Sequence, residues 1–344
     1  SWGTTATNRL FGGEPSSNPA RRCRNQSHSL PNWIQNWGRP GPSGPQYRGG
    51  HSSVPAGRVV HFRVMSKKSR PVPEPAEYIA HLTDAHTHLA SCGARDAATV
   101  AEFVTRAHAA GVQRICTVGD GLAETELALA AAESHPDVVA ACAIHPTKAR
   151  ELDDAARARL REMAAHPKCV AIGETGLDTY WIRHRPDETA PLAVQEEALR
   201  FHIDVAVAAG KALMIHNREA DADLLRVLGD APTPKYTILH CFSSPTAVAE
   251  EAIARGYVLS FAGNVTFKNN EELRQIAAMV PIDQLLIETD APFMTPVPYR
   301  GAKNEPAFIG HTALCVAAAR SMPVAKLAEA VAANFNRIYQ IAKP

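Results

Sequence analysis

The sequence predicts an α/β protein built as a single TIM (β/α)8 barrel, and three observations support this fold class. From residue 80 onward, short apolar runs alternate with longer, alanine-rich amphipathic runs, which is the pattern of repeated βα units. Eight such repeats fill about 260 residues, close to the usual size of this barrel. A doubly wound open sheet is the alternative, but no GxGxxG motif follows the first apolar run to support it.

Each of the eight apolar runs is short enough for a buried strand and is followed by polar or turn-forming residues. In chain order, the strand candidates span residues 80–85, 113–119, 137–144, 169–174, 212–216, 236–240, 257–261 and 284–289. The intervening stretches, such as 97–111 and 191–210, are amphipathic and end on a glycine suited to a helix C-cap.

The first 64 residues differ from the rest in composition. They contain eight Arg, no Lys and one acidic residue, Glu14, and therefore carry a charge of +7, which leaves −6 for the remainder of a chain whose net charge is +1. Without a periodic apolar face, residues 1–64 are predicted to be a disordered extension. Met65 then opens a linker over residues 65–79, and the barrel domain follows over 80–344.

Residues 1–64 are interpreted as translated upstream sequence or a remnant of cloning. An organelle transit peptide is the alternative, because an Arg- and Ser-rich, acid-poor composition fits that as well. No apolar run approaches the roughly 18 residues of a membrane span, and the N-terminus lacks a secretory signal. The seven cysteines form no CxxC pair, which argues against disulfides or a thiolate zinc site. We therefore expect a cytoplasmic protein, with no membrane association and no evident obligate protein partner.

Polar side chains of the kinds that bind metals stand at the predicted carboxyl ends of five strands, where TIM barrels carry their active sites. Two histidines, His86 and His88, stand at alternate positions directly after the first strand, so their side chains project from the same side. The candidate ligands are His86, His88, Glu174, His216, His240 and Asp290. A single histidine at a strand end is more often structural than ligating, but coincidence is a poor explanation for six such groups. Imidazole and carboxylate ligands without thiolate suit zinc, manganese or magnesium, and six ligands fit two divalent ions better than one.

Several motifs carry a resemblance to a known family. They are DAHTHL (84–89), AIHP (143–146), GETGLD (173–178), IHNRE (215–219), LHCFSS (239–244), VLSFAGNVTFKN (258–269), IETDAPFMTPVPYRGAKNEP (287–306) and NFNRIY (334–339). Through these motifs, residues 80–342 resemble TatD-type metal-dependent deoxyribonucleases of the amidohydrolase superfamily. The resemblance implies that His86, His88 and Asp290 hold one ion, that His216 and His240 hold the second, and that Glu174 bridges the two.

The chain departs from the family pattern at three positions. Thr147 stands where the family commonly has a second histidine after HP, and Asn217 stands where it often has serine. Ala302 replaces a base of the family's RGKRNEP segment. None of the three is a predicted ligand, so we expect them to affect substrate preference more than activity.

The catalytic candidates are Asp290 and Glu174. Asp290 is expected to accept a proton from the attacking water and to return it to the leaving oxygen; the local alternative is that Asp290 caps a turn in ETDAP. The residues expected to contact substrate are His145, Arg218, Lys268, Arg300 and Lys303, and the rings expected to stack on bases are Tyr180, Trp181, Phe242 and Tyr299. A satisfied structural histidine is an equally good interpretation of His145.

The predicted substrate is DNA, as a single strand or a 3′ end, because a body charge of −6 disfavours extensive nonspecific binding to duplex. The family resemblance implies a 3′-5′ exonuclease. A small-molecule amidohydrolase that cleaves an ester, amide or lactone is the alternative on the same scaffold. A binding protein without turnover is the third hypothesis.

Overall fold

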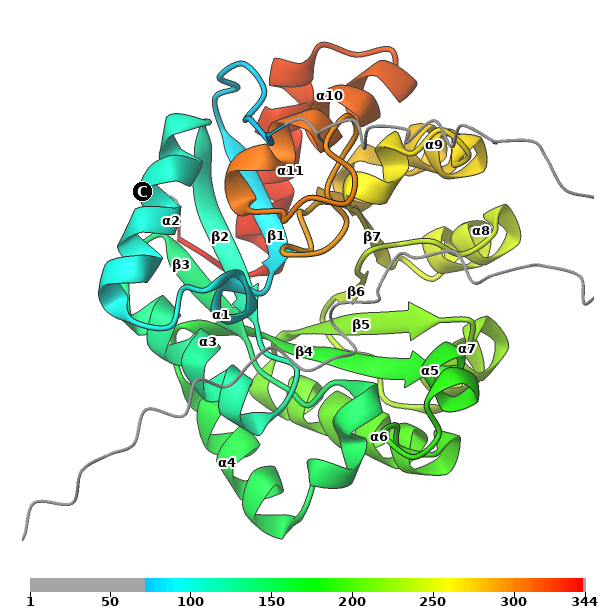
Figure 1. Cartoon of the computed structure of the whole chain (residues 1–344). Helices are drawn as coiled ribbons and strands as arrows, with labels where there is room; N and C mark the ends of the chain where they lie inside the picture. The colour runs from blue at the N-terminus through cyan, green and yellow to red at the C-terminus, as the bar shows by residue number, and fades with distance from the viewer. Residues whose placement is uncertain (1–71, 343–344) are drawn as a thin grey trace, which may run out of the picture. The chain divides into compact units, whose positions relative to one another are not determined.

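A computed structural model describes residues 72–342, and the predicted extension over 1–64 lies outside the described residues. Eight parallel strands form one sheet in the order β1 to β8, with helices between successive strands (Figure 1). The strands are β1 (Leu82–Thr87), β2 (Val112–Val118), β3 (Val138–Ala141), β4 (Cys169–Asp178), β5 (Ala212–Arg218), β6 (Thr237–Leu239), β7 (Val258–Phe261) and β8 (Leu285–Ile287). The TIM barrel predicted from the sequence is confirmed.

The ring closes where the segment after β8 meets β1. The backbone N–H of Asp290 donates to the carbonyl of His86 at 2.9 Å, and the N–H of His88 donates to the carbonyl of Ala291 at 2.7 Å. The buried carboxylate of Asp84 accepts from the N–H of Thr289 at 2.9 Å and from its hydroxyl at 2.5 Å. These bonds fix the ends of β1 and β8 against each other at the carboxyl end of the barrel.

The helices cover the strands and connect them. The α-helices are α1 (Leu89–Cys92), α2 (Ala97–Ala109), α3 (Leu122–Ser134), α4 (Asp154–Ala165), α5 (Thr179–His184), α6 (Leu192–Ala209), α7 (Asp221–Asp230), α8 (Thr246–Ala254), α9 (Glu271–Met279), α10 (Ile309–Ala319) and α11 (Val324–Ile338). Four short 3₁₀ segments are η2 (Pro146–Glu151), η3 (Gly263–Thr266), η4 (Ile282–Gln284) and η5 (Pro306–Phe308). Among the described residues, no single helix is long and apolar enough to cross a membrane, and only the bent pair Pro306–Ala319 and Val324–Ile338 meets the length and composition test.

All eight strands overlap the predicted runs, and the most informative difference is in β4. The sequence places the end of the fourth strand at Glu174, whereas β4 continues to Asp178. Two glycines allow this strand to lie close to β5. A side chain at Gly173 would overlap Met214, and one at Gly176, where φ is +143°, would overlap the carbonyl of His216.

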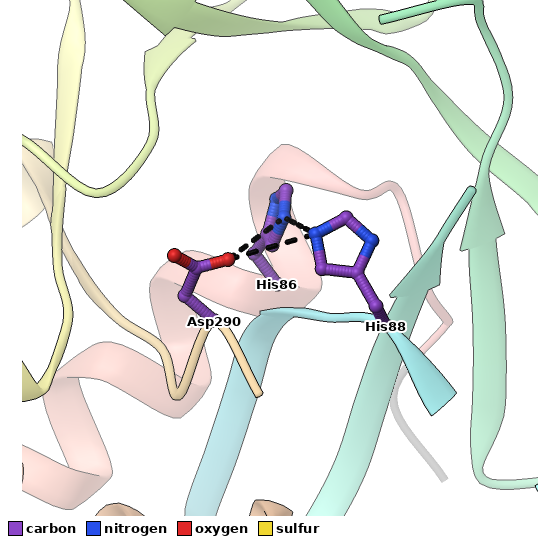
Figure 2. A group of neighbouring side chains, drawn as sticks. All are labelled: His86, His88 and Asp290. Carbon is purple, nitrogen blue, oxygen red and sulfur yellow. Dashed lines mark hydrogen bonds and ion pairs between the residues drawn. The ribbon is translucent and has the colours of Figure 1, made fainter. Parts of the chain in front are cut away.

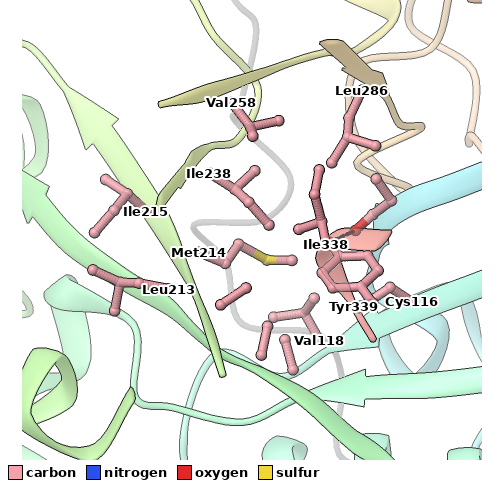
Figure 3. Close-up of a cluster of buried hydrophobic side chains, with 14 of the residues drawn as sticks. Cys116, Val118, Leu213, Met214, Ile215, Ile238, Val258, Leu286, Ile338 and Tyr339 are labelled. Carbon is pink, nitrogen blue, oxygen red and sulfur yellow. Dashed lines mark hydrogen bonds between the residues drawn. The ribbon is translucent and has the colours of Figure 1, made fainter. Parts of the chain in front are cut away.

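Apolar side chains fill the interior of the barrel. Figure 3 shows Met214, Ile238 and Leu286 from three strands around Ile338 and Tyr339, which end α11. The ring of Tyr339 is buried, and its hydroxyl donates to the carbonyl of Ala85 at 2.8 Å. Burying one such large side chain stabilises a fold by about 1.5–3 kcal/mol. This packed interior supports a polar layer at the carboxyl ends of the strands.

Residues 72–79, the described part of the predicted linker, lie against the barrel. Ile79 is buried, and its N–H donates to the carbonyl of Ala110 at 3.4 Å. The ring of His311 on α10 donates to the carbonyl of Glu74 at 2.9 Å. The six cysteines within the described residues are free thiols.

Candidate metal centre

The six predicted ligands meet at the carboxyl ends of the strands, as the barrel geometry requires. The sequence places them up to 204 residues apart, from His86 to Asp290, yet in the structure none has more than 6% of its surface exposed. A buried cluster of imidazoles and carboxylates is stable only when its members are hydrogen-bonded, paired or bound to a cation.

The first half of the centre consists of His86, His88 and Asp290 (Figure 2). The Nε2 atoms of the two histidines lie 3.1 Å apart, and each lies 3.6 Å from Oδ1 of Asp290. Alternation along the end of β1 directs both rings to one side. Asp290 has a φ of +52°, and its bond to the carbonyl of His86 holds it in that turn.

The second half of the centre consists of His216, His240 and Glu174. Oε1 of Glu174 lies 2.7 Å from Nδ1 of His216 and 2.8 Å from Nε2 of His240. The two histidines follow the same rule of position, because His216 is near the end of β5 and His240 follows β6 directly.

Glu174 also faces the first half. Its other oxygen, Oε2, lies 3.5 Å from Nε2 of His86 and 3.7 Å from Nε2 of His88. The carboxylate therefore presents one oxygen to each half of the centre.

The donor set fits divalent cations. Ligand atoms that share one ion at about 2.0–2.2 Å lie about 3.0–3.6 Å from one another, depending on the coordination geometry. The separations of 3.1 Å and 3.6 Å in the first half match that range. Within residues 72–342, four triads have ligand atoms within 4.8 Å of one another: His86/His88/Asp290, His86/Glu174/His240, His145/Glu174/His216 and His88/Asp120/Glu174.

The nitrogen of each histidine that points away from the centre has its own partner. Nε2 of His216 lies 2.9 Å from Oδ2 of Asp178, and Nδ1 of His240 lies 3.0 Å from Oε1 of Glu288. An N–H that donates to such a carboxylate leaves the lone pair of the other ring nitrogen facing inward, where a metal ion can use it.

The first half has weaker partners of this kind. Nδ1 of His88 lies 3.4 Å from Oδ1 of Asp120, and Nδ1 of His86 lies 3.0 Å from the sulfur of Met214. A thioether is a much weaker acceptor than a carboxylate.

The sequence interpretation missed Asp120, Asp178 and Glu288, although signals for all three were present. Asp178 and Glu288 stand four and two residues from predicted ligands, which is same-face spacing on an extended strand. Asp120 comes just after the second strand, at the position that singled out the other ligands.

Most of the shifted pKa values in the centre favour positive charge, although burial and the neighbouring His240 hold the pKa of His86 well below its usual value. Burial lowers the pKa of His216, but Asp178 and Glu174 outweigh burial and raise it to about 9. Burial likewise lowers the pKa of His88, and Asp120 with Asp290 raises it to about 9. Burial raises the pKa of Glu174, but the neighbouring imidazoles hold it well below its usual value. Protons or a divalent cation can supply the charge that these groups favour.

His145 lies beside the second half and is polarised by its own loop. Its Nδ1 accepts from the backbone N–H of Thr147 at 3.2 Å and lies 2.7 Å from the Thr147 hydroxyl. The neutral ring therefore carries its proton on Nε2, which lies 3.5 Å from Oε1 of Glu174. This tautomer makes His145 a hydrogen-bond donor to the centre. The backbone N–H of residue 147 sets this tautomer, and the Thr147 hydroxyl adds a second contact to the same nitrogen.

Arg218 is the predicted substrate contact with the most defined surroundings. Its guanidinium lies 3.8 Å from the centroid of the Tyr180 ring and 5.3 Å from that of Trp181. The ring of His184 stacks on Tyr180 at 4.0 Å, and two planar groups at such distances cannot share one face of a ring. Both faces of Tyr180 are therefore covered. We name Tyr180, Trp181 and Arg218 the arginine wall.

The structure does not support base stacking on most of the predicted rings. Trp181 is 8% exposed and Phe242 is 3% exposed, so neither offers a free face, and Tyr180 is covered as described. Phe242 packs at 6.2 Å against Phe261 of β7. Tyr299 meets His311 edge to face at 5.5 Å and is half-buried. Its position leaves it as the best remaining candidate for contact with a base.

The other predicted cations lie on exposed loops. Lys268, Arg300 and Lys303 are all exposed, and the guanidinium of Arg300 lies 4.3 Å from the ring centroid of Phe267. Arg218 differs from these three side chains because it is half-buried.

The NEP end of the longest motif anchors its loop. The side-chain amide of Asn304 donates to the carbonyls of Thr289 at 2.9 Å and Phe293 at 2.7 Å. Glu305 receives three hydrogen bonds from Arg106 of α2, at 2.9, 3.0 and 3.2 Å. These bonds tie the loop after β8, which carries Asp290, to α2.

The chain is similar to several known proteins. The family model described as TatD related DNase matches residues 83–340. An uncharacterized metal-dependent hydrolase TatD of Mycobacterium tuberculosis is 47% identical over 258 residues, which cover 75% of this chain and 97% of that protein. A 3′-5′ ssDNA/RNA exonuclease TatD of Erwinia tasmaniensis is 33% identical over 249 residues, covering 70% of this chain and 93% of that protein.

A solved structure shares the fold. The crystal structure of YJJV, a TatD homolog from Escherichia coli, superimposes with a TM-score of 0.67 at 24% identity, over 76% of this chain and 99% of that one.

Proposed function

Because the chain belongs to the TatD-related DNase family, we propose that it is a metal-dependent hydrolase that uses two divalent ions to cut single-stranded DNA from the 3′ end. One observation carries the proposal. Glu174 is buried between two groups of ligands and presents a different oxygen to each, as a carboxylate shared by two ions does. The name of the Erwinia relative favours a nucleic acid substrate.

In this proposal His86, His88 and Asp290 would hold one ion, His216 and His240 would hold the other, and Glu174 would offer one oxygen to each. A bound divalent ion lowers the pKa of water and neutralises charge on the scissile group. Zinc, manganese and magnesium are all compatible with ligands of this type. The outward-facing partners Asp178 and Glu288 keep the lone pairs of His216 and His240 directed inward.

Asp290 is the proposed proton acceptor. Its Oδ1 lies 3.6 Å from both imidazoles of the first half, and its other oxygen, Oδ2, is buried at the same site. One carboxylate can therefore hold an attacking water in place, take its proton, and pass the proton to the leaving oxygen. The hydrogen bond from Asp290 N–H to His86 keeps this side chain directed at the centre.

Donors around the centre are proposed to bind the scissile phosphodiester. His145 offers an N–H from Nε2 beside Glu174, and Arg218 offers a half-buried guanidinium at the end of β5. Such donors stabilise the negative charge that grows on phosphate oxygens during cleavage. The exposed Lys268, Arg300 and Lys303 are proposed to attract the strand at longer range.

The test is cleavage of a 5′-labelled single-stranded oligonucleotide by the full chain. One set of substrates has a free 3′ hydroxyl and the other has a blocked 3′ end. Each is incubated with manganese, magnesium or zinc, or with a chelator. RNA of the same sequence, and a panel of small esters, amides and lactones, are incubated in parallel.

We expect a ladder of shortened DNA that requires both metal and a free 3′ end. Cutting of the 3′-blocked oligonucleotide would replace the exonuclease with an endonuclease. Faster cutting of RNA would change the preferred substrate. Metal binding without cleavage of either nucleic acid, combined with turnover of a small molecule, would favour the amidohydrolase alternative.

A further inference from the structure

We propose that Asp178 is a positioning residue that links the metal-facing His216 to the arginine wall, so that metal occupancy and the placement of the substrate strand are coupled. This inference rests on the proposed function, because it assumes that His216 binds a metal ion. Asp178 lies at the last position of β4 and is fully buried.

The two oxygens of Asp178 serve two different elements. Oδ2 lies 2.9 Å from Nε2 of His216, and Oδ1 accepts from the backbone N–H of Trp181 at 2.7 Å. The second bond caps the N-terminus of α5, the helix that carries Tyr180 and Trp181. One carboxylate therefore contacts both a proposed metal ligand and the segment that forms the wall.

The backbone of Asp178 is fixed as well. Its N–H donates to the side-chain oxygen of Gln195 at 2.7 Å, and Gln195 is completely buried on α6. In the β4–β5 pairing, Gly176 lies opposite His216, and Asp178 lies opposite Arg218. Because the backbone of Asp178 is held in place, a shift of its carboxylate moves His216 on one side and Trp181 on the other.

Within the wall, Tyr180 and Trp181 set the position of Arg218. Its guanidinium lies over Tyr180 at 3.8 Å and near Trp181 at 5.3 Å. Arg218 is two residues from His216 on the same strand, so both side chains point toward the same side. Asp178 thus determines how a phosphate-binding group sits relative to the metal centre.

Asn and Ser separate the two roles of Asp178. Asparagine caps helices as well as aspartate does, so Asp178→Asn keeps the bond to Trp181. Its NH2 group then faces Nε2 of His216, where an acceptor is needed. The His216 proton moves to Nδ1, the atom that faces Glu174, and the ring loses its inward lone pair. Asp178→Ser also keeps the cap but is too short to reach His216.

The matched control is Glu288→Gln. Glu288 supports His240 as Asp178 supports His216, at 3.0 Å and 2.9 Å respectively, but its other hydrogen bonds come from Ser260 and Cys241, which do not lie on α5. Substitution at either carboxylate, Asp178 or Glu288, is expected to weaken zinc binding about 10–100-fold. Only the substitutions at Asp178 are expected to break the link between His216 and the arginine wall.

The experiment follows tryptophan emission of the full chain during titration with zinc, an ion without redox chemistry. A Trp181→Phe variant identifies the share of the signal that comes from Trp181, one of four tryptophans in the chain. Zinc binding is measured separately by calorimetry, and thermal unfolding shows that each variant is folded. Binding of a cleavage-resistant single-stranded phosphorothioate oligonucleotide is then measured at saturating zinc.

We expect zinc to change the emission of Trp181 in the wild type and in Glu288→Gln, but not in Asp178→Asn or Asp178→Ser at saturation. We also expect substitution at Asp178 to weaken oligonucleotide binding about fivefold or more, with little change in Glu288→Gln. A Trp181 signal that persists in both saturated Asp178 variants, or that is absent in the zinc-bound wild type, would overturn the link alone. A wild type that binds no zinc would overturn the metal centre and the link together.

Discussion

The two halves of the centre have the same kinds of ligands but different support. In the second half, His216 and His240 each donate to a buried carboxylate, Asp178 or Glu288, at 2.9 and 3.0 Å. In the first half, His86 faces the sulfur of Met214 at 3.0 Å. The residue types of the ligands therefore locate the centre in the sequence. The hydrogen-bond partners of their outward-facing ring nitrogens determine how firmly each half is held.

The supporting carboxylates are themselves fixed only in the second half. Glu288 accepts from the hydroxyl of Ser260 at 2.5 Å and from the N–H of Cys241 at 2.8 Å. The partner of His88 is Asp120, whose side chain is 12% exposed and lies 3.4 Å away. The first half depends instead on the backbone bonds that close the barrel between β8 and β1. We expect its geometry to be the more easily disturbed.

The largest expected effect comes from Asp290 in the first half. Asp290→Asn removes the proposed proton acceptor and an anionic ligand while preserving the shape of the side chain. We expect turnover of single-stranded DNA at saturating metal to fall about 10²–10⁴-fold, because that is the contribution of general acid–base groups. Steady-state kinetics of the full chain measure the loss of turnover, and thermal unfolding shows whether the variant is folded.

The control for this variant is Asp283→Asn. Asp283 is exposed on η4, before β8, at the opposite end of that strand from Asp290. It should leave turnover unchanged. If Asp290→Asn kept turnover within tenfold of the wild type at saturating metal, Asp290 would have no essential part in proton transfer.

The next largest effect compares the two kinds of support directly. Glu288→Gln in the second half should weaken metal binding about 10–100-fold. Met214→Leu in the first half keeps the side-chain volume and removes only a weak acceptor, so it should weaken metal binding less. Calorimetric titration with zinc measures both changes. An equal loss in the two variants would show that a sulfur behind His86 matters as much as a carboxylate, and the contrast between the halves would disappear.

Much of the fold could be predicted from the sequence because strand runs and barrel geometry are local and periodic. His86, His88 and Asp290 stood at strand ends in the sequence and meet in the structure within 3.6 Å. The predicted end of the fourth strand, at Glu174, was four residues too early. In the structure Gly173 and Gly176 permit close approach to β5, a contact that the sequence alone does not show.

The support of the ligands could not be predicted in the same way. The pairs His216–Asp178 and His240–Glu288 span 38 and 48 residues, and nothing in a single sequence shows which carboxylate reaches which ring. The assignment of Phe242 to base stacking failed for a similar reason, since an aromatic residue beside a ligand can pack inward. Its contact with Phe261 places it in the core.

His202 offers a pH test of the packing next to the second half, because it contacts Ile144 and Thr175, the sequence neighbours of His145 and Glu174. The ring is fully buried on α6, lies 2.9 Å from the hydroxyl of Thr175, and accepts from the N–H of Ile144 at 3.3 Å. Burial lowers its pKa from 6.5 to about 3. The unfolded chain therefore takes up a proton below about pH 6.5 that the folded chain does not, and the folded state loses stability as the pH falls toward 3.

The expected loss from this one group is about 1.4 kcal/mol of unfolding free energy per pH unit between pH 6.5 and 3. Urea unfolding of the full chain at pH 7, 6 and 5 measures it. His202→Gln can keep an acceptor for Ile144 and a donor for Thr175 but has no proton to gain. The unfolding free energy of His202→Gln should fall less steeply with decreasing pH, by that amount per pH unit. Equal pH slopes for the variant and the wild type would show that His202 is not the source of the acid sensitivity.

The smallest expected effect comes from a comparison of two cations, Lys303 after β8 and Arg218 at the end of β5. Lys303 follows β8 on an exposed loop, whereas Arg218 ends β5 and is half-buried against Tyr180. Exposed charges contribute less than about 1 kcal/mol each, so Lys303→Ala should raise KM for single-stranded DNA by less than about fivefold. If Lys303 meets a phosphate, the slope of log affinity against log salt should fall by about one. Arg218→Gln should raise KM further, because a preplaced guanidinium loses little entropy on binding. If Lys303→Ala instead had the larger effect, the strand would enter over the loop after β8, and the first half of the centre would be the half that positions the substrate.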